Sequence, residues 1–333
     1  MQQLQNTSLL PYNTFGIDVT AEHFADVNAL ADLQEIPAGL PLHILGGGSN
    51  ILLTGQVRGL VLHNKLKGIT MLRENDDHVW LSVASGEVWH DFVLYTIEMG
   101  LGGIENLALI PGTVGAAPIQ NIGAYGTEVK QTIEEVSFWR LSERKLVTIS
   151  NADCHFGYRD SIFKTQLRGQ FFITSVTFRL NKKPVLNTSY GAIEQELKEM
   201  GVTHLTVRDV AQAVIRIRTS KLPDPKITGN AGSFFKNPTI PLAHYKLLQA
   251  VYPTIPHFPV SADTVKVPAA WLIEQCGWKG HRTGDAGVHT KQALVLVNYG
   301  YASGNDIWQL SGSIIDSVAN RFNISLEREV QVW

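Results

Sequence analysis

The sequence is poor in cysteine and almost neutral in net charge. Its 333 residues include two cysteines, Cys154 and Cys276, which stand far apart and form neither a disulfide framework nor a zinc-binding pattern. We interpret both as small apolar side chains of the interior. The formal net charge of -2 offers no electrostatic footprint for nucleic acid or an anionic membrane surface. A disulfide scaffold, a zinc module and a nucleic-acid partner are therefore not expected.

Long apolar runs are also lacking. No stretch approaches the roughly 20 residues that a membrane-spanning helix needs. The first residues contain no basic segment followed by an apolar run, so we expect no signal peptide. No exposed heptad or broad apolar stripe stands out, which favours a monomer. The sequence thus predicts a cytoplasmic protein without a membrane partner.

The composition is that of an ordinary globular protein, with 44% apolar and 17% charged residues. The length suits two or three domains with a sizeable core. Apolar patterning and turn residues predict strands at 42–45, 51–53, 79–84, 136–139, 171–176 and 324–332, and helices through 88–97, 207–217, 269–276 and 307–318. Asn305 is the expected N-cap of the last helix. The Pro223 and Pro225 region ends a helix and marks a domain boundary.

Two glycine-rich segments carry the strongest functional signal. Gly46–Asn50 reads GGGSN, and Pro111–Gly126 reads PGTVGAAPIQNIGAYG. Glycine lacks a Cβ atom, so such loops let the backbone approach a flat or anionic ligand closely. A dinucleotide loop of the Rossmann type opens a helix, whereas Gly46–Asn50 leads into another short apolar run. Together the two loops indicate a large cofactor bound by a strand–loop–strand device.

Three residues are candidates for chemistry, each with a plainer alternative. Arg159 presents a rigid cationic fork suited to a carboxylate or enolate, or it simply pairs with Asp160. Ser233 lies between small residues and aromatics, where a partly desolvated hydroxyl could act as a general acid, or it is a turn serine. Glu329 lies on the polar phase of the final strand with Glu327, where a solvent-facing residue is the ordinary reading.

Several motifs in a fixed order resemble the UDP-N-acetylenolpyruvoylglucosamine reductase (MurB) family of bacterial cell-wall synthesis. They are the two glycine loops, YRDSIFK at 158–164, GNAGSFFKNP at 229–238 and LEREV at 326–330, with NTFG at 13–16 near the start. The resemblance spans nearly the whole chain. NTSYG at 187–191 resembles the tyrosine loop of the family's longer class.

The resemblance implies an α+β protein with a two-lobed FAD-binding fold of the vanillyl-alcohol-oxidase (PCMH) type plus a C-terminal α+β substrate domain. Residues 1–67 would form the first FAD-binding lobe, 68–220 the second lobe with the tyrosine-loop insertion near 185–195, and 221–333 the substrate-binding domain. The implied reaction reduces UDP-N-acetylglucosamine enolpyruvate to UDP-N-acetylmuramate. NADPH is the implied cosubstrate, and FAD is held noncovalently.

The resemblance also implies which residues form the site. FAD would be bound by Gly46, Gly47, Gly48, Ser49, Asn50, Pro111, Gly112, Thr113, Val114, Gly115, Ile119, Gln120, Asn121, Gly123, Ala124 and Tyr125. Arg159 and Glu329 would stabilise and orient the enolate-like species that forms when the vinyl carbon receives hydride, and Ser233 would protonate the adjacent carbon. Substrate contacts would come from Tyr190, Lys221, Asn237, Lys266 and Gln292. No metal is implied.

One departure and two alternatives accompany the resemblance. The family commonly has an arginine after Glu-Val, where this chain has Gln331, so the electrostatics near Glu329 differ. An oxidase of the same flavin fold is one alternative, but neither glycine loop holds the histidine or cysteine that such enzymes use for covalent flavin attachment. A nonenzymatic flavin- or UDP-sugar-binding regulator is the other, and it would explain the loops but not Arg159, Ser233 and Glu329 together.

Overall fold

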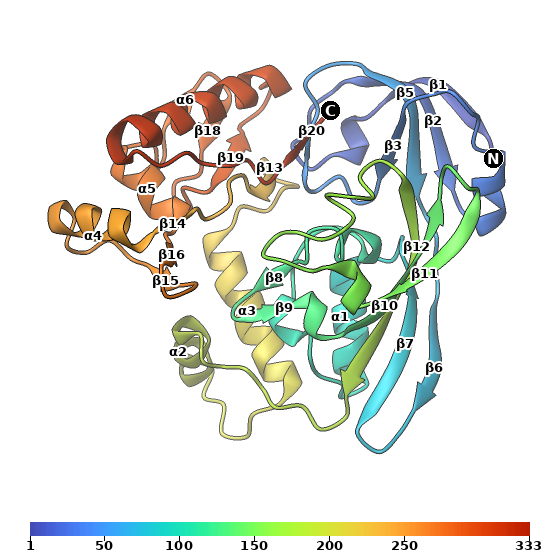
Figure 1. The fold of residues 1–333 in the computed structure, drawn as a ribbon, viewed down its shortest axis with the longest axis horizontal. Coiled ribbons are helices and arrows are strands. Elements are labelled where there is room, and N and C mark those ends of the chain that lie inside the picture. The colour runs from blue at the N-terminus through green and yellow to red at the C-terminus, as the bar shows by residue number, and fades with distance from the viewer. The chain divides into compact units, whose positions relative to one another are not determined.

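The computed structural model describes all 333 residues, which form two compact units (Figure 1). Both units are discontinuous in sequence. Unit 1 comprises Met1–Thr7, Ala21–Gly47 and Arg58–Ser220, and unit 2 comprises Ser8–Thr20, Gly48–Val57 and Lys221–Trp333. The chain therefore passes between the units five times, including once inside the first glycine loop and once at the end of a helix. The three-segment division expected from the sequence stays a prediction.

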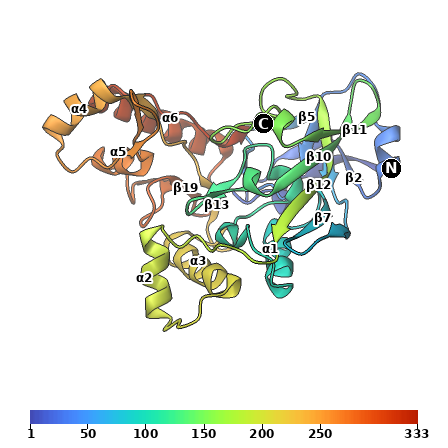
Figure 2. The same ribbon diagram turned by 60° about the horizontal axis from the view of Figure 1, so that its bottom comes forward.

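Apart from single end residues of some elements, unit 1 holds three α-helices, two larger sheets and the two-stranded β8-β9 sheet. Its four-stranded sheet has the order β1-β2-β5-β3, and its five-stranded sheet the order β11-β10-β12-β7-β6. The bounds are β1 Gln3–Ser8, β2 Thr20–Val27, β3 Leu42–Leu45, β5 Val57–Asn64, β6 Ile69–Glu74, β7 His78–Ala84, β8 Gly123–Ala124, β9 Thr127–Glu128, β10 Ile133–Arg140, β11 Lys145–Ser150, β12 Phe171–Asn181, α1 Trp89–Glu98, α2 Gly191–Glu199 and α3 Val207–Lys221. Figure 2 shows α2 beside α3.

In the five-stranded antiparallel sheet, the inner strands β10, β12 and β7 are largely buried, whereas the edge strands β6 and β11 are mostly exposed. Side chains alternate across a strand, so neighbouring residues of β10 enter different cores. Phe138 packs with α1, whereas Trp139 and its cross-strand partner Phe172 join apolar residues of the four-stranded sheet. The helix α1 contacts β12 through Phe92 and Phe178, whose ring centroids lie 4.9 Å apart. This layering fixes β7 and α1, from which the long glycine loop departs.

Unit 2 is built from short strands and three helices. Its sheets have the orders β13-β19-β18-β17, β14-β16-β15 and β20-β4, the last a parallel pair. The bounds are β4 Ile51–Leu52, β13 Gly229–Ser233, β14 Thr239–Pro241, α4 Leu242–Val251, β15 Phe258–Pro259, β16 Thr264–Lys266, α5 Ala269–Gln275, β17 Arg282–Thr283, β18 Ala286–Val288, β19 Val295–Asn298, α6 Gly304–Phe322 and β20 Gln331–Val332.

Most of the predicted elements are confirmed. Strands β3, β4, β7, β10 and β12 and helices α1, α3, α5 and α6 lie where the apolar pattern placed them. The expected N-cap of α6 is wrong. Ser303, not Asn305, caps the helix, since its hydroxyl accepts the Asp306 amide and the Asp306 carboxylate accepts the Ser303 amide. No helix, the 19-residue α6 included, is long and apolar enough to cross a bilayer.

The predicted final strand over 324–332 is much shorter in the structure. Only Gln331–Val332 pairs as a strand, and Arg328 forms an isolated antiparallel bridge with Phe235. The expected alternation holds for Ile324, which is buried, but Val332 is 41% exposed. Short bridges to two different segments replace a continuous ladder, so the chain cannot keep one regular strand here. Cys154 is buried as expected, and its burial raises the pKa of the thiol to about 12, whereas Cys276 is half-buried.

Truncation of Phe178 tests the packing of α1 on the sheet. The side chain is fully buried between Trp89 and Phe92. We expect Phe178→Ala to lower the free energy of unfolding by about 3–5 kcal/mol, because it removes buried area and leaves a cavity. Denaturant titration followed by fluorescence measures this loss. The control Leu72→Ala, at a 53% exposed position of β6, should stay within about 0.5 kcal/mol of the parent. Equal effects of both substitutions would contradict this packing.

Candidate active site

The two glycine loops meet within unit 1. A Cβ atom on Gly46 would lie 2.6 Å from Oγ1 of Thr113, and one on Gly47 would lie 3.0 Å from Cα of Gly112. The two loops therefore approach so closely that side chains at these two positions would be crowded. The next residue, Gly48, belongs to unit 2 and has a φ of +59°, a conformation that favours glycine.

Backbone hydrogen bonds fix the start of the long loop against β7 and α1. The Gly112 carbonyl accepts from the Trp89 amide at 3.0 Å. The Val114 amide donates to the carbonyl of Glu87, and the Gly115 amide donates to that of Ser85. The loop thus begins on a rigid platform.

Asn121 holds the middle of this loop by its side chain. It is fully buried and has a φ of +45°, which is unusual for any residue but glycine. Its amide group donates to the carbonyl of Gly157 at 2.9 Å and to Glu128, and its oxygen accepts the Lys130 amide at 3.1 Å. Both polar groups of the side chain are thus engaged in hydrogen bonds within the protein. Asn121 therefore shapes the loop.

Arg159 lies in a tight turn and also adopts a left-handed conformation, with a φ of +53°. Its guanidinium donates to the carbonyl of Gly123 at 2.8 Å, and its own carbonyl accepts from Nζ of Lys164 at 3.1 Å. The carboxylate of Asp160 instead accepts the Ser161 amide at 3.0 Å. These contacts direct Arg159 toward the glycine loop. Left-handed residues held in this way are enriched at functional sites.

Arg218 is a further cationic residue that sequence reasoning missed. Its Nε donates to the carbonyl of Leu109 at 3.3 Å. Burial lowers the pKa of Arg218, the nearby charge of Arg159 lowers it further, and a hydrogen bond with Tyr125 opposes both. A signal was present, because Arg218 follows Val214 by four positions and so falls on the apolar face of α3.

A second side chain binds the same strained residue. Leu109 has a φ of +58°, and its amide donates to Nδ1 of His90 at 3.0 Å. This contact requires the neutral imidazole with its proton on Nε2. Both backbone groups of Leu109 are therefore held by side chains, His90 from α1 and Arg218 from α3. This arrangement, the Leu109 clamp, sets the conformation immediately before the glycine loop.

Tyr190 and Tyr125 form an edge-to-face pair in unit 1. Their ring centroids lie 5.3 Å apart at an interplanar angle of 90°. Tyr190 is 47% exposed, and Tyr125 is half-buried with a φ of +49°. Burial raises the pKa of the Tyr125 hydroxyl, and the neighbouring Arg218 opposes that effect. The predicted tyrosine loop therefore lies against the predicted cofactor loop.

Ser233 and Glu329 are brought together in unit 2, although 96 positions separate them in the sequence. Ser233 ends β13, and the Glu329 amide donates to the carbonyl of the next residue, Phe234, at 2.8 Å. The expected partial desolvation of Ser233 is wrong for this structure, since its side chain is exposed. The loop positions Ser233 at an edge and buries the neighbouring Phe234 instead.

The contacts of the final segment distinguish Glu329 from Glu327. The carboxylate of Glu327 is 70% exposed and pairs with Lys236, as a surface residue does. Arg328 points the other way, with its guanidinium 3.7 Å above the ring of Trp308 and its Nε donating to Ser311. Glu329 is half-buried, and its carbonyl accepts from the side chain of Asn50 at 3.4 Å. Asn50 thus supports the segment that carries Glu329.

The predicted substrate-contact residues of unit 2 differ in how their side chains are used. Lys221 is exposed at the end of α3, and Lys266 is half-buried at the end of β16. The Asn237 oxygen accepts the Ala269 amide at 2.9 Å, which holds the start of α5. Gln292 is half-buried in a turn closed by its carbonyl.

The remaining predicted cofactor residues lie in the same loops. Ser49, Ile119, Gln120 and Ala124 are half-buried and Pro111 is exposed, while Val114 and Gly115 are buried. The carbonyl of Ile119 accepts a hydrogen bond from the hydroxyl of Ser161 at 2.6 Å. A side chain from outside the loop therefore holds this part of it as well.

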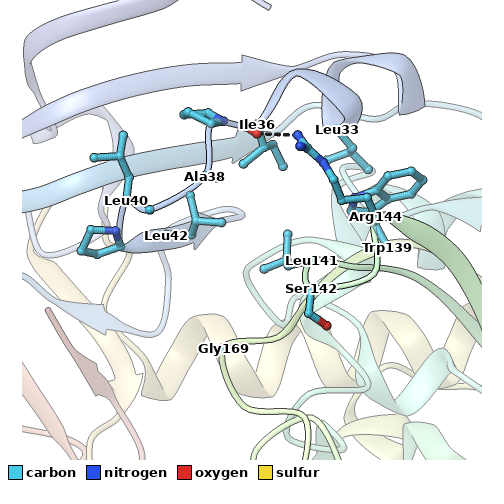
Figure 3. Close-up of a pocket in the computed structure, with 13 residues that line it drawn as sticks. Leu33, Ile36, Ala38, Leu40, Leu42, Trp139, Leu141, Ser142, Arg144 and Gly169 are labelled. Atoms are coloured by element: carbon cyan, nitrogen blue, oxygen red, sulfur yellow. Dashed lines mark hydrogen bonds between the residues drawn. The ribbon is translucent and has the colours of Figure 1, made fainter.

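A separate hollow of about 550 Å³ lies elsewhere in unit 1 (Figure 3). Its lining is largely apolar and includes Leu33, Leu42 and Trp139. Arg144 lies at one side, where its guanidinium donates to the carbonyls of Gln34 and Ile36. None of the predicted site residues lines this hollow.

Comparison with known proteins agrees with the order of these motifs. Residues 19–142 match the FAD binding domain family, and residues 224–333 match the family of the UDP-N-acetylenolpyruvoylglucosamine reductase C-terminal domain. The chain is 48% identical to the UDP-N-acetylenolpyruvoylglucosamine reductase of Flavobacterium johnsoniae, with all of both chains covered. It is also 48% identical to that of Chromobacterium violaceum, over 99% of this chain and 98% of the relative.

The first of these matches defines the class, that of proteins with an FAD-binding domain. The chain belongs to the UDP-N-acetylenolpyruvoylglucosamine reductase family. The crystal structure of the Thermus caldophilus reductase has the same fold, with a TM-score of 0.70 at 23% identity, covering 100% of this chain and 98% of that one. The predicted α+β FAD-binding fold with a C-terminal domain is therefore confirmed.

The Leu109 clamp predicts a pH dependence. Burial lowers the pKa of His90 below its ordinary value of 6.5, Arg218 lowers it further, and Asp91 opposes the shift. Because protonation is disfavoured in the folded state, the stabilisation is fully present above about pH 6.5 and is lost as the pH falls through the lowered pKa. Hydrogen exchange at the Leu109 amide should therefore accelerate on acidification.

His90→Asn supplies the control, since its side-chain oxygen can accept the same hydrogen bond but does not titrate in this range. Its Leu109 amide should show no such acceleration once the intrinsic pH dependence of exchange is subtracted. Matching pH profiles in the two proteins would remove His90 from the clamp.

Proposed function

We propose that this protein reduces UDP-N-acetylglucosamine enolpyruvate to UDP-N-acetylmuramate with NADPH, through bound FAD, as a step in peptidoglycan precursor synthesis. The observation that carries the proposal is the 48% identity over full length with named reductases. The FAD-binding domain supplies the class of redox chemistry that this reaction needs. The protein is accordingly an FAD-dependent oxidoreductase.

The donor set of unit 1 suits FAD, whose diphosphate is anionic and whose ring is flat. The two glycine loops approach so closely that a Cβ atom on Gly46 would lie 2.6 Å from Oγ1 of Thr113, which suits binding of such a group by the backbone. The residues proposed to hold FAD lie in the two glycine loops and include Ile119, Gln120 and Tyr125 of the second loop. Bound FAD supplies the two-electron chemistry that links NADPH oxidation to reduction of the enolpyruvyl double bond.

Arg159 is proposed to bind the substrate carboxylate and to stabilise the charge that develops as the double bond is reduced. Its guanidinium stays protonated, and its hydrogen bond to Gly123 fixes its orientation before substrate arrives. A preorganised donor of this kind is worth about 3 kcal/mol, or roughly a hundredfold in rate.

Ser233 is proposed to deliver the proton to the carbon next to the one that receives hydride, which completes reduction of the double bond. Glu329 is proposed to assist charge handling at the reacting carbon. This proposal is supported by their adjacency in unit 2, which is set by the hydrogen bond from the Glu329 backbone amide to the Phe234 carbonyl. A serine hydroxyl is a weak acid, so its rate depends on neighbours that stabilise the alkoxide.

Tyr190, Lys221, Asn237, Lys266 and Gln292 are proposed to bind the nucleotide diphosphate. Lysine provides point charges for phosphate, and an exposed tyrosine provides a flat face and a hydroxyl. The pairing of Tyr190 with Tyr125 supports assignment to the class with a tyrosine loop. We further propose that segments 1–67 and 68–220 act as the FAD lobes and 221–333 as the substrate domain.

The cellular setting follows from the same reaction. Nucleotide-linked precursors and NADPH are cytoplasmic metabolites, so we place the protein in the cytoplasm, where its product serves cell-wall biogenesis, cell shape and cell division. We propose a monomer with small-molecule partners only.

Anaerobic visible spectra of the purified protein test the function directly. NADPH should bleach the flavin absorbance, and the enolpyruvyl UDP-sugar should then restore it. Bleaching without recovery would keep the flavoenzyme and discard the substrate. Absence of any flavin signal after FAD addition would overturn the proposal.

Ser233→Ala separates the two half-reactions. Flavin reduction by NADPH should proceed at the parent rate, and reoxidation by the UDP-sugar should slow by about a hundredfold or more, since only that step uses the hydroxyl. Stopped-flow absorbance measures both rates. Ser325→Ala, at an exposed position outside the site, serves as the matched control. Equal loss in both half-reactions would point to a folding defect rather than a lost proton donor.

A further inference from the structure

Asn106 connects the predicted cofactor loop to the predicted tyrosine loop. It lies in a short 3-10 helix, Glu105–Leu107, and its side chain is 1% exposed. Its amide group donates to the carbonyl of Tyr125 at 3.1 Å and to the carbonyl of Asn187 at 2.9 Å. One buried side chain thus binds two segments that are 62 positions apart in sequence. We name this arrangement the Asn106 joint.

Asn187 extends the joint toward Tyr190. Its side-chain amide group donates to the carbonyl of Gly126 at 3.2 Å, so the tyrosine loop also bonds the cofactor loop directly. Its side-chain oxygen accepts from the amide and the hydroxyl of Ser189, at 3.3 and 2.8 Å. Gly126 has a φ of +78°, which favours glycine, and a Cβ atom there would lie 3.0 Å from Nδ2 of Asn187. The residue before Tyr190 is therefore fixed by the residue that binds the cofactor loop.

We propose that Asn106 is a positioning residue that couples occupancy of the cofactor loop to the placement of Tyr190. The inference rests on the proposed function, in which the loop at 123–126 binds FAD and Tyr190 binds the nucleotide. The joint holds the carbonyl of Tyr125, a residue in a left-handed conformation that a bound ligand can select or release. Whatever fixes Tyr125 also fixes Asn187, Ser189 and the ring that packs on Tyr125.

The coupling has a stated direction and is reciprocal. FAD on the loop should order Tyr190 and tighten binding of the UDP-sugar, and by linkage the UDP-sugar should tighten retention of FAD. Loss of the joint should leave each site intact but uncoupled. The expected size is about tenfold in affinity, the effect of roughly one net hydrogen bond.

Two variants and one control test the coupling. Asn106→Ala removes the joint from the core, and Asn187→Ala weakens it from the loop side at a half-buried position that should not impair folding. Asn151→Ala is the matched control. Its side chain makes the same kind of contact, donating to the carbonyls of Lys130 and Ile133, away from the tyrosine loop.

Limited proteolysis gives a readout that is independent of activity. Chymotrypsin cleavage of the bond after Tyr190 is measured by mass spectrometry in deflavinated and FAD-reloaded protein. FAD should slow this cleavage in the parent and in Asn151→Ala. It should have little effect in Asn106→Ala and a reduced effect in Asn187→Ala.

Kinetics give the second readout. Asn106→Ala should raise KM for the UDP-sugar about tenfold, whereas its flavin reduction by NADPH should match that of the parent. Parent-like KM and parent-like protection of Tyr190 by FAD in Asn106→Ala would overturn the proposal, as would the same change in Asn151→Ala. If Asn106→Ala fails to fold, Asn187→Ala decides by the same criteria. A parent without turnover would refute the proposed function, while the proteolysis would still test the joint.

Discussion

The site of unit 1 depends on one constraint, which is that an irregular glycine-rich backbone must have its peptide groups satisfied without a strand ladder. Backbone hydrogen bonds meet part of this demand, and side chains from the surrounding helices and turns meet another part. Asn106 donates to the carbonyl of Tyr125 and Arg159 to that of Gly123, whereas Asn121, within the loop, donates to the carbonyl of Gly157. Arg218 likewise donates to the carbonyl of Leu109. The residues that shape the loop are therefore largely polar, and they hold left-handed conformations that would otherwise relax.

In unit 2, single contacts bring together two candidate residues that are distant in the sequence. Ser233 and Glu329 come from distant parts of the sequence, and single backbone contacts join them in place of a regular sheet. Arg328 packs on Trp308 and so sets which side of the final segment faces α6. The neighbouring glutamates then face elsewhere, one pairing with Lys236 at the surface and the other half-buried. The role of a glutamate here is decided by its neighbours, because both have the same chemistry.

Much of the fold could be predicted from sequence because regular elements follow local patterns. The apolar spacing of α1, α3 and α6 and the strands β7, β10 and β12 reflect burial on one or two faces. The pattern failed where pairing is not local. The segment 324–332 alternates as a strand does, yet it has no continuous partner. Helix α6 starts at Gly304 because Ser303 caps it in a capping box with Asp306, where the sequence predicted Asn305. Arg218 was missed because arginine is ordinarily a surface residue, although its position on the apolar face of α3 indicated burial.

The sequence by itself determined the family, the class of cofactor and the loops that carry the glycines. The reason is that the order of the motifs and the positions of the flexible glycines follow directly from the residue types. It could not decide which glycines allow close packing, which asparagines hold the loop or which two tyrosines pack against each other. Tertiary structure decided that Gly46 and Gly47 pack on Gly112 and Thr113, and that Asn106 bonds both Tyr125 and Asn187. The physical reason is that hydrogen bonds and steric contacts between distant segments depend on the distances and angles of the folded chain, which no local pattern specifies.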